Sequence, residues 1–225
     1  MAVRRSYEDG CAGAHALDLI GERWALLIVR ELLLGPKRFT DLRAGLPTIS
    51  PNVLSLRLDE LEQAAVVRRR KLPPPFGAWI YELTDWGKQL ETVIVELGRW
   101  GARSPALPRD AALSVDSLIL SFRTMFDAHV AGSFRARLEL RFGDDRFHVE
   151  VSERRIALAR GAADEPDAII ESDPNTLAAI SYDGRKLAEA VRAGDLKITG
   201  DKKAAERFLA LFTLPARAPA VDKIS

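Results

Sequence analysis

Two short stretches of helical pattern separated by a tight break constrain the fold of this chain more than any other feature. The first stretch covers Arg38–Leu46 and ends at Gly45 and Pro47. The second begins at Ser50-Pro51, where a hydroxyl caps free backbone N–H groups and a proline is pre-set for the first helical turn. Leucines then recur at helical spacing and predict one buried face: Leu54, Leu58 and Leu61.

A basic run and a strand-like segment follow these two predicted helices. The run is Arg68–Lys71, the proline-rich tip is Pro74–Gly77, and the strand-like segment is Trp79–Leu83. Two helices joined by a tight turn and followed by a two-stranded ribbon form a winged helix-turn-helix. The second helix of such a pair is shaped to enter the DNA major groove, so the pattern predicts a DNA-binding domain.

The composition is that of a soluble globular protein, with 225 residues, 47% of them hydrophobic and 29% charged. The net charge is only +1, so any affinity for nucleic acid has to come from local clusters of charge. No apolar run is long enough to span a bilayer, and Met1–Asp9 lacks the apolar stretch of a secretory signal. A single cysteine fits a reducing compartment. We therefore expect a cytoplasmic protein with no membrane span.

The periodicity changes along the chain and predicts two domains of an α+β protein. An apolar stripe from Leu17 to Leu32 predicts one long helix that ends before Gly35-Pro36. Another helix is expected from Thr84-Asp85 to Trp100, with an apolar face suited to dimerisation. Two prolines within residues 104–109 indicate a linker. We expect an N-terminal DNA-binding and dimerisation domain over residues 1–103 and a ligand-binding domain over residues 110–225.

The second domain has the pattern of an antiparallel sheet covered by helices. Apolar and polar residues alternate on both sides of Gly143-Asp144-Asp145, which predicts a hairpin with one buried face. Further strands are expected at residues 155–159, 168–172 and 196–199. Helices are expected at residues 112–128, 174–182, 186–193 and 202–212.

Residues 11–101 resemble the HxlR-type winged-helix transcriptional regulators. The resemblance rests on Cys11, Ala16–Trp24, Gly35–Phe39, Ile49-Ser50-Pro51, Arg57-Leu58, Tyr81–Thr84, Gly87 and Trp100-Gly101. It implies a cytoplasmic homodimer that binds double-stranded DNA at a near-palindromic operator. The chain departs from the family pattern at three informative positions. Asn52 replaces a common basic residue, Ala78 replaces an arginine at the wing tip, and Ala65 replaces a glycine after the second helix. A positive φ would cost Ala65 about 1 kcal/mol relative to glycine, so we expect this helix end to be built differently.

Residues 110–214 look like a sterol-carrier-protein-2-type lipid-binding domain, an α+β fold with an apolar tunnel. The stretches that carry this resemblance are Pro166–Ile170, Gly194–Ile198 and Thr199–Asp201. The resemblance implies an apolar small-molecule or lipid ligand. Apolar residues are the candidates for the tunnel wall, although phenylalanine and leucine at helical spacing also suit an ordinary core: Leu118, Phe122, Phe126, Leu140, Ile180, Phe208, Leu211 and Phe212.

Candidate DNA contacts lie on the second helix, at the start of the helix before it, and on the ribbon. On the second helix they are Ser50, Asn52, Ser55, Leu56 and Arg57, of which Asn52 can pair with adenine and Leu56 can touch a thymine methyl. Arg57 either reaches a phosphate or braces the fold through an acidic neighbour. The candidates outside that helix are Lys37, Arg38, Thr40, Arg69, Arg70, Lys71 and Trp79. Because successive strand residues face opposite ways, at most two of the four basic residues in Arg68–Lys71 can meet one DNA backbone. The proline-rich tip, Pro74–Gly77, either inserts beside the DNA minor groove or is only a rigid loop.

Cys11 is a candidate redox sensor, because the resemblance implies a reactive cysteine at this position and a thiolate near cations reacts readily. The alternative is a small buried residue without reactivity. The three histidines are scattered, without the paired spacing of a metal site, so we expect no metal and no cofactor. We find no nucleophile with its base, no P-loop and no dinucleotide glycine motif, and we expect no enzymatic activity.

Together these observations predict a DNA-binding transcriptional regulator whose operator affinity responds to an apolar small molecule in the C-terminal domain. Two alternatives belong to other classes. In one, the chain is a lipid or sterol carrier and its winged helix serves dimerisation or protein docking. In the other, the C-terminal domain is an enzyme that acts on an acyl or sterol compound.

Overall fold

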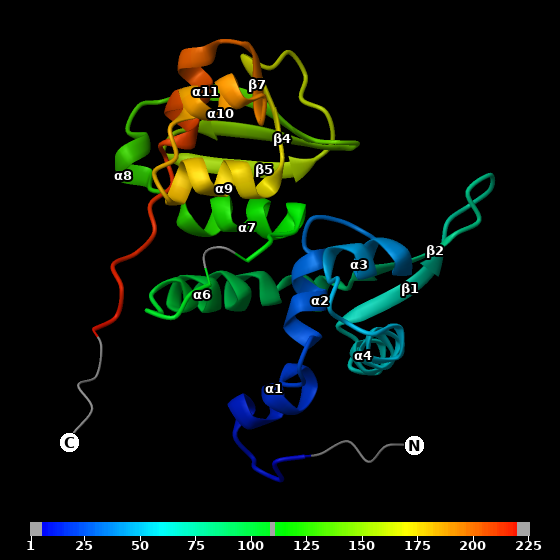
Figure 1. Ribbon diagram of the computed structural model, residues 1–225. Coiled ribbons are helices and arrows are strands. Elements are labelled where there is room, and N and C mark those ends of the chain that lie inside the picture. The colour runs from blue at the N-terminus through cyan, green and yellow to red at the C-terminus, as the bar shows by residue number, and fades with distance from the viewer. Residues whose placement is uncertain (1–5, 109–110, 220–225) are drawn as a thin grey trace. The chain divides into compact units, whose positions relative to one another are not determined.

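The computed structural model describes residues 6–108 and 111–219, and the chain divides into two compact units (Figure 1). The N-terminal unit extends to Ile94 and the C-terminal unit begins at Val95, so the division lies inside helix α6 (Leu90–Ala102). The predicted domain boundaries at residues 103 and 110 lie further along the chain and stay a prediction. Three segments lie outside the described residues: residues 1–5, residues 109–110 and residues 220–225. The first belongs to the N-terminus that we expect to lack a secretory signal, and the second includes Arg109 of the predicted linker.

The N-terminal unit has the predicted order of two helices joined by a turn and followed by a two-stranded ribbon. Its elements are α1 (Ala12–Ile20), α2 (Ala25–Leu32), α3 (Phe39–Gly45), α4 (Pro51–Gln63), β1 (Val67–Lys71), β2 (Trp79–Leu83), α5 (Asp85–Lys88) and the start of α6. Helices α3 and α4 are the expected pair. Strands β1 and β2 pair antiparallel, with Val67 opposite Leu83 and Lys71 opposite Trp79.

The prediction of one helix from Leu17 to Leu32 is wrong, because the chain turns between α1 and α2. Trp24 adopts a left-handed backbone conformation (φ 83°) at the start of α2, which a continuous helix does not allow. The amide of Ala25 donates to the carbonyl of Glu22 at 3.0 Å and closes the turn. Leu17, which the prediction placed on the buried stripe, is 52% exposed.

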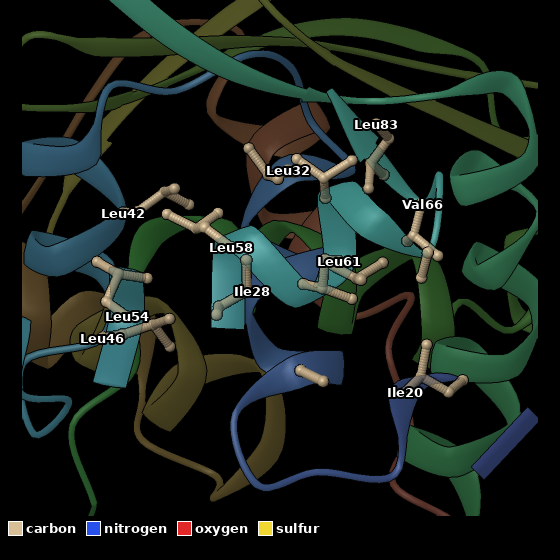
Figure 2. Close-up of a cluster of buried hydrophobic side chains, with 14 of the residues drawn as sticks. Ile20, Ile28, Leu32, Leu42, Leu46, Leu54, Leu58, Leu61, Val66 and Leu83 are labelled. Atoms are coloured by element: carbon tan, nitrogen blue, oxygen red, sulfur yellow. The ribbon is translucent and has the colours of Figure 1, made fainter. Parts of the chain in front are cut away.

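A single apolar core holds α4 against α2, α3 and the ribbon (Figure 2). Leu54, Leu58 and Leu61 are buried as predicted, at 0%, 0% and 1% exposure. Ile28 from α2 and Leu42 from α3 are also buried in this cluster. Burying such side chains is worth roughly 1.5–3 kcal/mol each, so the leucine stripe determines which way α4 faces.

The end of α4 is not built differently from the family pattern, contrary to the expectation for Ala65. Ala65 keeps the left-handed conformation, with φ 56°. The amide of Val66 donates to the carbonyl of Leu61 at 2.9 Å, as in a helix end that normally carries glycine. The hydroxyl of Thr84 donates to the carbonyl of Ala65 at 2.7 Å and helps to hold this conformation.

The helix predicted from Thr84-Asp85 to Trp100 is divided at Gln89 into α5 and α6. Thr84 caps α5, since its hydroxyl accepts from the amide of Gly87 at 2.9 Å. Gly87 is buried so close to the carbonyl of Val66 that a Cβ would lie 2.1 Å from that oxygen. This contact explains why glycine is needed here. The close approach of Gly87 to Val66 packs α5 against the end of α4.

The C-terminal unit is an α+β fold whose sheet is mixed, not purely antiparallel as predicted. Its elements are α7 (Val115–Met125), α8 (Ala128–Ala131), β3 (Ala136–Phe142), β4 (Asp145–Ser152), β5 (Arg155–Arg160), β6 (Ala168–Ser172), α9 (Pro174–Tyr182), α10 (Leu187–Ala193), β7 (Leu196–Gly200) and α11 (Lys202–Leu209). The strand order is β5-β4-β3-β6-β7. Strands β3 and β6 are neighbours that run parallel, and the chain forms β4 and β5 between them. The other neighbouring strands run antiparallel.

Aromatic rings fill the space between the sheet and its covering helices. Phe122 on α7 stacks on Phe212 with ring centroids 4.2 Å apart, and Phe208 on α11 meets both rings edge-on. Most of the predicted tunnel-wall residues are part of this dense core: Leu118, Phe122, Leu140, Phe208, Leu211 and Phe212 are buried. Phe126 and Ile180 are partly exposed. Within the described ranges, no helix is both long and apolar enough to cross a membrane.

Replacing Ala65 by glycine should stabilise the protein, because glycine adopts positive φ without the steric cost that an L side chain bears. We expect Ala65→Gly to raise the free energy of unfolding by about 1 kcal/mol. Ala44→Gly, at the exposed next-to-last residue of α3, should lower it by up to about 0.5–1 kcal/mol. Urea unfolding followed by circular dichroism measures both. Equal destabilisation by the two changes would contradict the left-handed conformation of Ala65.

Candidate nucleic-acid interface

The outer edge of α4 presents the residues that the sequence nominated for base contacts. Ser50 caps the helix, its hydroxyl accepting from the amide of Val53 at 3.3 Å. Asn52, Ser55 and Leu56 are exposed on the side opposite the leucine stripe, and Leu56 is 44% exposed. An amide, a hydroxyl and an apolar side chain therefore share the first two turns of α4. These are the turns that a helix-turn-helix protein places against base edges.

Arg57 braces the fold through acidic neighbours, which is one of the two alternatives proposed for it. Its guanidinium forms ion pairs with Glu60 and, at 2.8 Å, with Glu22 in the turn before α2. Its Nε also donates to the carbonyl of Arg23 at 3.2 Å. The side chain is only 15% exposed. Arg57 thus ties α4 to the α1–α2 turn, and we leave it out of the proposed DNA contacts.

Lys37 is also occupied inside the protein. Its ammonium lies 2.7 Å from a carboxylate oxygen of Glu31, whose side chain is fully buried. Arg30 lies 3.0 Å from the other carboxylate oxygen. Because an unpaired carboxylate in this core would be costly, the ammonium of Lys37 serves a structural role. Its backbone also pairs with that of Tyr81 on β2, through hydrogen bonds of 3.0 and 2.8 Å.

The start of α3 keeps two of its three nominated residues on the surface. Arg38 and Thr40 are exposed. Asp41 satisfies this helix end itself, since it accepts from the amide of Arg38 at 3.1 Å and from the hydroxyl of Thr40 at 3.2 Å. A phosphate here would therefore meet the guanidinium of Arg38 and not a vacant helix terminus.

The register of the ribbon sorts its basic residues onto two faces. Arg69 lies opposite Tyr81 and Lys71 lies opposite Trp79, so these residues share one face. Arg68 and Arg70 point the other way, in agreement with the prediction that at most two of the four cations can share a surface. Arg70 was nominated together with Arg69 and Lys71, and the register separates it from them.

Arg68 and Arg70 are both engaged by one acid. Glu82 accepts from Arg68 at 2.7 Å and pairs with Arg70 at 2.9 Å. Although partial burial opposes the charged form, the hydrogen bonds from Arg70 and Arg68 lower the pKa of Glu82 below its usual range. Glu82 is therefore ionised at neutral pH and offsets charge on this face of the ribbon.

On the other face, Arg69 is held in place by an aromatic ring. Its guanidinium carbon lies 4.4 Å from the ring centroid of Trp79 and 5.9 Å from that of Tyr81. Such contacts are worth about 0.5–1 kcal/mol at exposed sites, enough to restrict a long side chain. Trp79 is 49% exposed. Tyr81 was not nominated from the sequence, and the period-two spacing from Trp79 is the signal that could have found it.

Cys11 lies at the surface, immediately before α1. The backbone N–H groups of Ala14 and then Gly13 favour the thiolate and lower the pKa of Cys11. The alternative of a buried cysteine is therefore wrong, and the reactivity of Cys11 stays a prediction. The structure shows no group of three or more metal-binding side chains within its described residues.

Sequence comparisons identify the family of the N-terminal unit. A profile of the HxlR-like helix-turn-helix family matches residues 19–106. The uncharacterized HTH-type transcriptional regulator YvaP of Bacillus subtilis is 44% identical over 85 residues, which are 38% of this chain and 79% of YvaP. The HTH-type transcriptional regulator YodB of the same species is 42% identical over 85 residues, which are 38% of this chain and 76% of YodB. The chain belongs to the HxlR-like helix-turn-helix family.

The HxlR domain occupies less than half of this chain, and a second family matches the remainder. The solved reduced form of YodB is 38% identical and spans 43% of this chain and 95% of YodB, with a TM-score of 0.39. A profile of the alkyl sulfatase C-terminal family matches residues 110–218. The second match names a different family from the sterol-carrier-protein-2 resemblance. The chain thus carries the DNA-binding helix-turn-helix domain of HxlR-type regulators, followed by a region that matches the alkyl sulfatase C-terminal family.

Removing the ammonium of Lys37 should weaken the fold more than DNA binding, because it leaves the buried carboxylate of Glu31 with less compensation. We expect Lys37→Met to lower the free energy of unfolding by about 2 kcal/mol or more. The matched control Arg38→Met removes an exposed cation next to it and should change stability by less than about 0.5 kcal/mol. Urea unfolding measures both. Wild-type stability of Lys37→Met combined with a large loss of DNA affinity would instead assign Lys37 to a phosphate.

The lowered pKa of Cys11 predicts the pH dependence of its reactivity. Thiolate is the reactive form, so alkylation speeds up as the pH rises through the pKa. A lowered pKa moves this rise to lower pH than for a free thiol. We expect iodoacetamide to modify Cys11 with a midpoint below that of free cysteine in the same buffers, as followed by intact-mass spectrometry. Cys11→Ser is the control, since the chain has one cysteine. A midpoint at or above that of free cysteine would contradict the assignment.

Proposed function

We propose that this protein is a dimeric transcriptional regulator that reads a near-palindromic operator with α4 and adjusts its operator affinity to an apolar small molecule bound by the C-terminal unit. The observation that carries the proposal is the exposed edge of α4, with Asn52, Ser55 and Leu56 opposite a fully buried leucine stripe. Membership of the HxlR family supports the same function.

The proposed contacts with DNA divide into base contacts and phosphate contacts. Asn52, Ser55 and Leu56 take the base edges, because they lie in the first two turns of α4. Arg69, stacked on Trp79, and Lys71 beside it take the phosphates along the wing. Arg38 and Thr40 extend the phosphate contacts at the start of α3.

Two copies of the chain are proposed to pair through apolar surface of the N-terminal unit. Leu17 on α1, Trp86 on α5 and Val93 on α6 are exposed by 52%, 50% and 47%. A half-open cavity of about 270 Å³ lies among them, with Trp86, Val93 and apolar residues of α1 in its wall. Apolar patches of this kind mark interaction sites. A symmetric dimer would place two α4 helices in successive major grooves about 34 Å apart.

We propose that a ligand controls operator affinity because the chain joins an HxlR-type unit to a second unit of another kind. The resemblance to lipid-binding domains and the alkyl-sulfatase-C match both concern the C-terminal unit. Ligand binding can shift operator affinity only if one arrangement of the two units binds the ligand better. A tenfold change in operator affinity needs about 1.4 kcal/mol of such coupling. Cys11, exposed and with a lowered pKa, is a second candidate point of control through oxidation.

Base reading by α4 can be tested with one matched pair of variants. Asn52→Ala removes an amide from the first turn of α4, and Gln63→Ala removes the same group from the last turn, about 16 Å further along the helix. In fluorescence-anisotropy titrations with promoter DNA flanking the gene, we expect Asn52→Ala to weaken binding about 5–100-fold. Gln63→Ala should bind as the wild type does. Both should bind an unrelated duplex equally weakly.

Two outcomes of this titration would contradict the proposal. Equal losses for Asn52→Ala and Gln63→Ala would show that α4 does not read bases with its N-terminal turns. Wild-type binding that disappears at moderate salt for every duplex would favour the alternative function, a lipid carrier whose winged helix serves dimerisation or docking.

A further inference from the structure

A cavity of about 520 Å³ opens on the surface of the C-terminal unit, at the edge of the aromatic core, because the ring of Phe126 in its wall lies 6.5 Å from that of Phe212. Its wall comes from the second half of α6, from the segment that joins α7 to α8, and from the chain after α11. The volume falls within the range of about 300–1,000 Å³ that small-molecule sites occupy. This cavity and the predicted apolar tunnel share only Phe126 among the residues nominated from the sequence.

One part of the cavity wall is apolar. Met125, Phe126 and Pro215 contribute to it, and Trp100 of α6 stands at the rim with 75% of its surface exposed. An exposed tryptophan beside a hollow lined by a methionine and a phenylalanine offers a flat apolar surface against which a ring or short chain can pack. These residues select for a ligand with an apolar body.

The wall carries two arginines, Arg99 and Arg103, and two carboxylates, Glu96 and Asp127. Arg99 pairs with Glu96 at 2.5 Å, which neutralises both. Asp127 accepts from the amides of Val130 at 3.1 Å and His129 at 2.8 Å, and these bonds lower the pKa of its carboxyl. Arg103 donates through Nε to the carbonyl of Ala216 at 3.3 Å, and within the described residues no carboxylate forms an ion pair with it.

Arg154 does not line the cavity, but it contacts two residues of the wall, and its charge favours the ionised form of Asp127. Arg154 donates to the carbonyl of Ala128 at 3.0 Å and approaches Nδ1 of His129 at 3.0 Å. Because an arginine only donates, Nδ1 of His129 accepts in this contact. The positive charge of Arg154 lowers the pKa of Asp127 further. The terminal nitrogens of Arg103 can donate to an anionic group in the cavity.

Helix α6 connects this cavity to the DNA-binding unit through continuous backbone. Leu90 and Ile94, in its first half, pack on the core that holds α4. Glu96, Arg99 and Trp100, in its second half, line the cavity. The guanidinium of Arg99 donates to the carbonyl of Thr124 at 3.1 Å and fastens this half of α6 to the end of α7. A ligand in the cavity would therefore touch the helix that also supports the DNA-binding core.

We propose that this cavity is a regulatory site for an apolar carboxylate, with Arg103 binding the carboxylate and Trp100, Met125 and Phe126 contacting the apolar body. The inference rests on the proposed function and deepens it, because it places the ligand beside α6 and not in the packed aromatic core. The ligand stabilises one position of α6 against α7, and the DNA-binding unit responds through the same helix.

Calorimetric titration of the full-length protein with naphthoate tests the site, and naphthamide serves as the neutral probe of the same shape. Arg103→Met removes the proposed carboxylate partner. Thr213→Trp fills the cavity from an exposed position of its wall. Arg192→Met is the matched control, since it removes an exposed arginine of α10 that does not line the cavity. We expect Arg103→Met to weaken naphthoate binding about tenfold or more, and Thr213→Trp to abolish it. Arg192→Met should bind as the wild type does, and naphthamide should bind at least about tenfold more weakly than naphthoate.

Three results would overturn the site: no naphthoate binding to the wild type, unchanged binding to both cavity variants, or equal binding of naphthoate and naphthamide. Operator titrations with and without naphthoate test the regulatory part separately. Wild-type operator affinity that naphthoate leaves unchanged would remove regulation, although the site itself would stand. Failure of the wild type to bind promoter DNA at all would overturn the proposed function, whereas calorimetry would still report on the cavity.

Discussion

The burial of Leu54, Leu58 and Leu61 in the N-terminal core is the interaction on which the DNA-binding surface depends. Truncating one such leucine to alanine typically costs about 2–5 kcal/mol, whereas an exposed ion pair is worth about 0–1 kcal/mol. The stripe therefore sets the rotation of α4 about its axis. Asn52 and Leu56 face outward because the leucines face inward. The ion pairs of Arg57 then tie this orientation to the turn before α2.

Internal ion pairs decide how much positive charge the N-terminal unit offers to DNA. Lys37 serves the buried Glu31, and Arg68 and Arg70 share Glu82. The basic cluster Arg68–Lys71 thus has two of its four cations paired with an acid of the same unit. Arg69 and Lys71 remain on one face of the wing, where Trp79 steadies the arginine. The proposed dimer would add together the phosphate contacts proposed for two copies on one operator.

The C-terminal unit combines a compact core with an open cavity. The rings of Phe122, Phe208 and Phe212 pack against one another. Apolar burial in this dense core stabilises the unit. The open cavity lies instead where α6 meets α7, beside a helix shared with the DNA-binding unit.

Local signals made much of the fold predictable. Ser50-Pro51 marked the start of α4, the Gly143-Asp144 turn marked the β3–β4 hairpin, and β6 and α9 have their predicted bounds. The errors arose where a distant contact overrides a local pattern. The stripe from Leu17 to Leu32 reads as one helix, yet the turn that Arg57 braces divides it. Ala65 keeps a conformation disfavoured for alanine because Thr84, far along the chain, holds its carbonyl.

The sequence by itself determined the nature and order of the elements and the exposed edge of α4, because caps and periodicities act over a few neighbouring residues. Only the tertiary structure decided which cations stay available to DNA, that β3 and β6 run parallel, and that a cavity opens beside α6. Those outcomes depend on residues brought together from distant parts of the chain. Spacing along a sequence does not encode such distances.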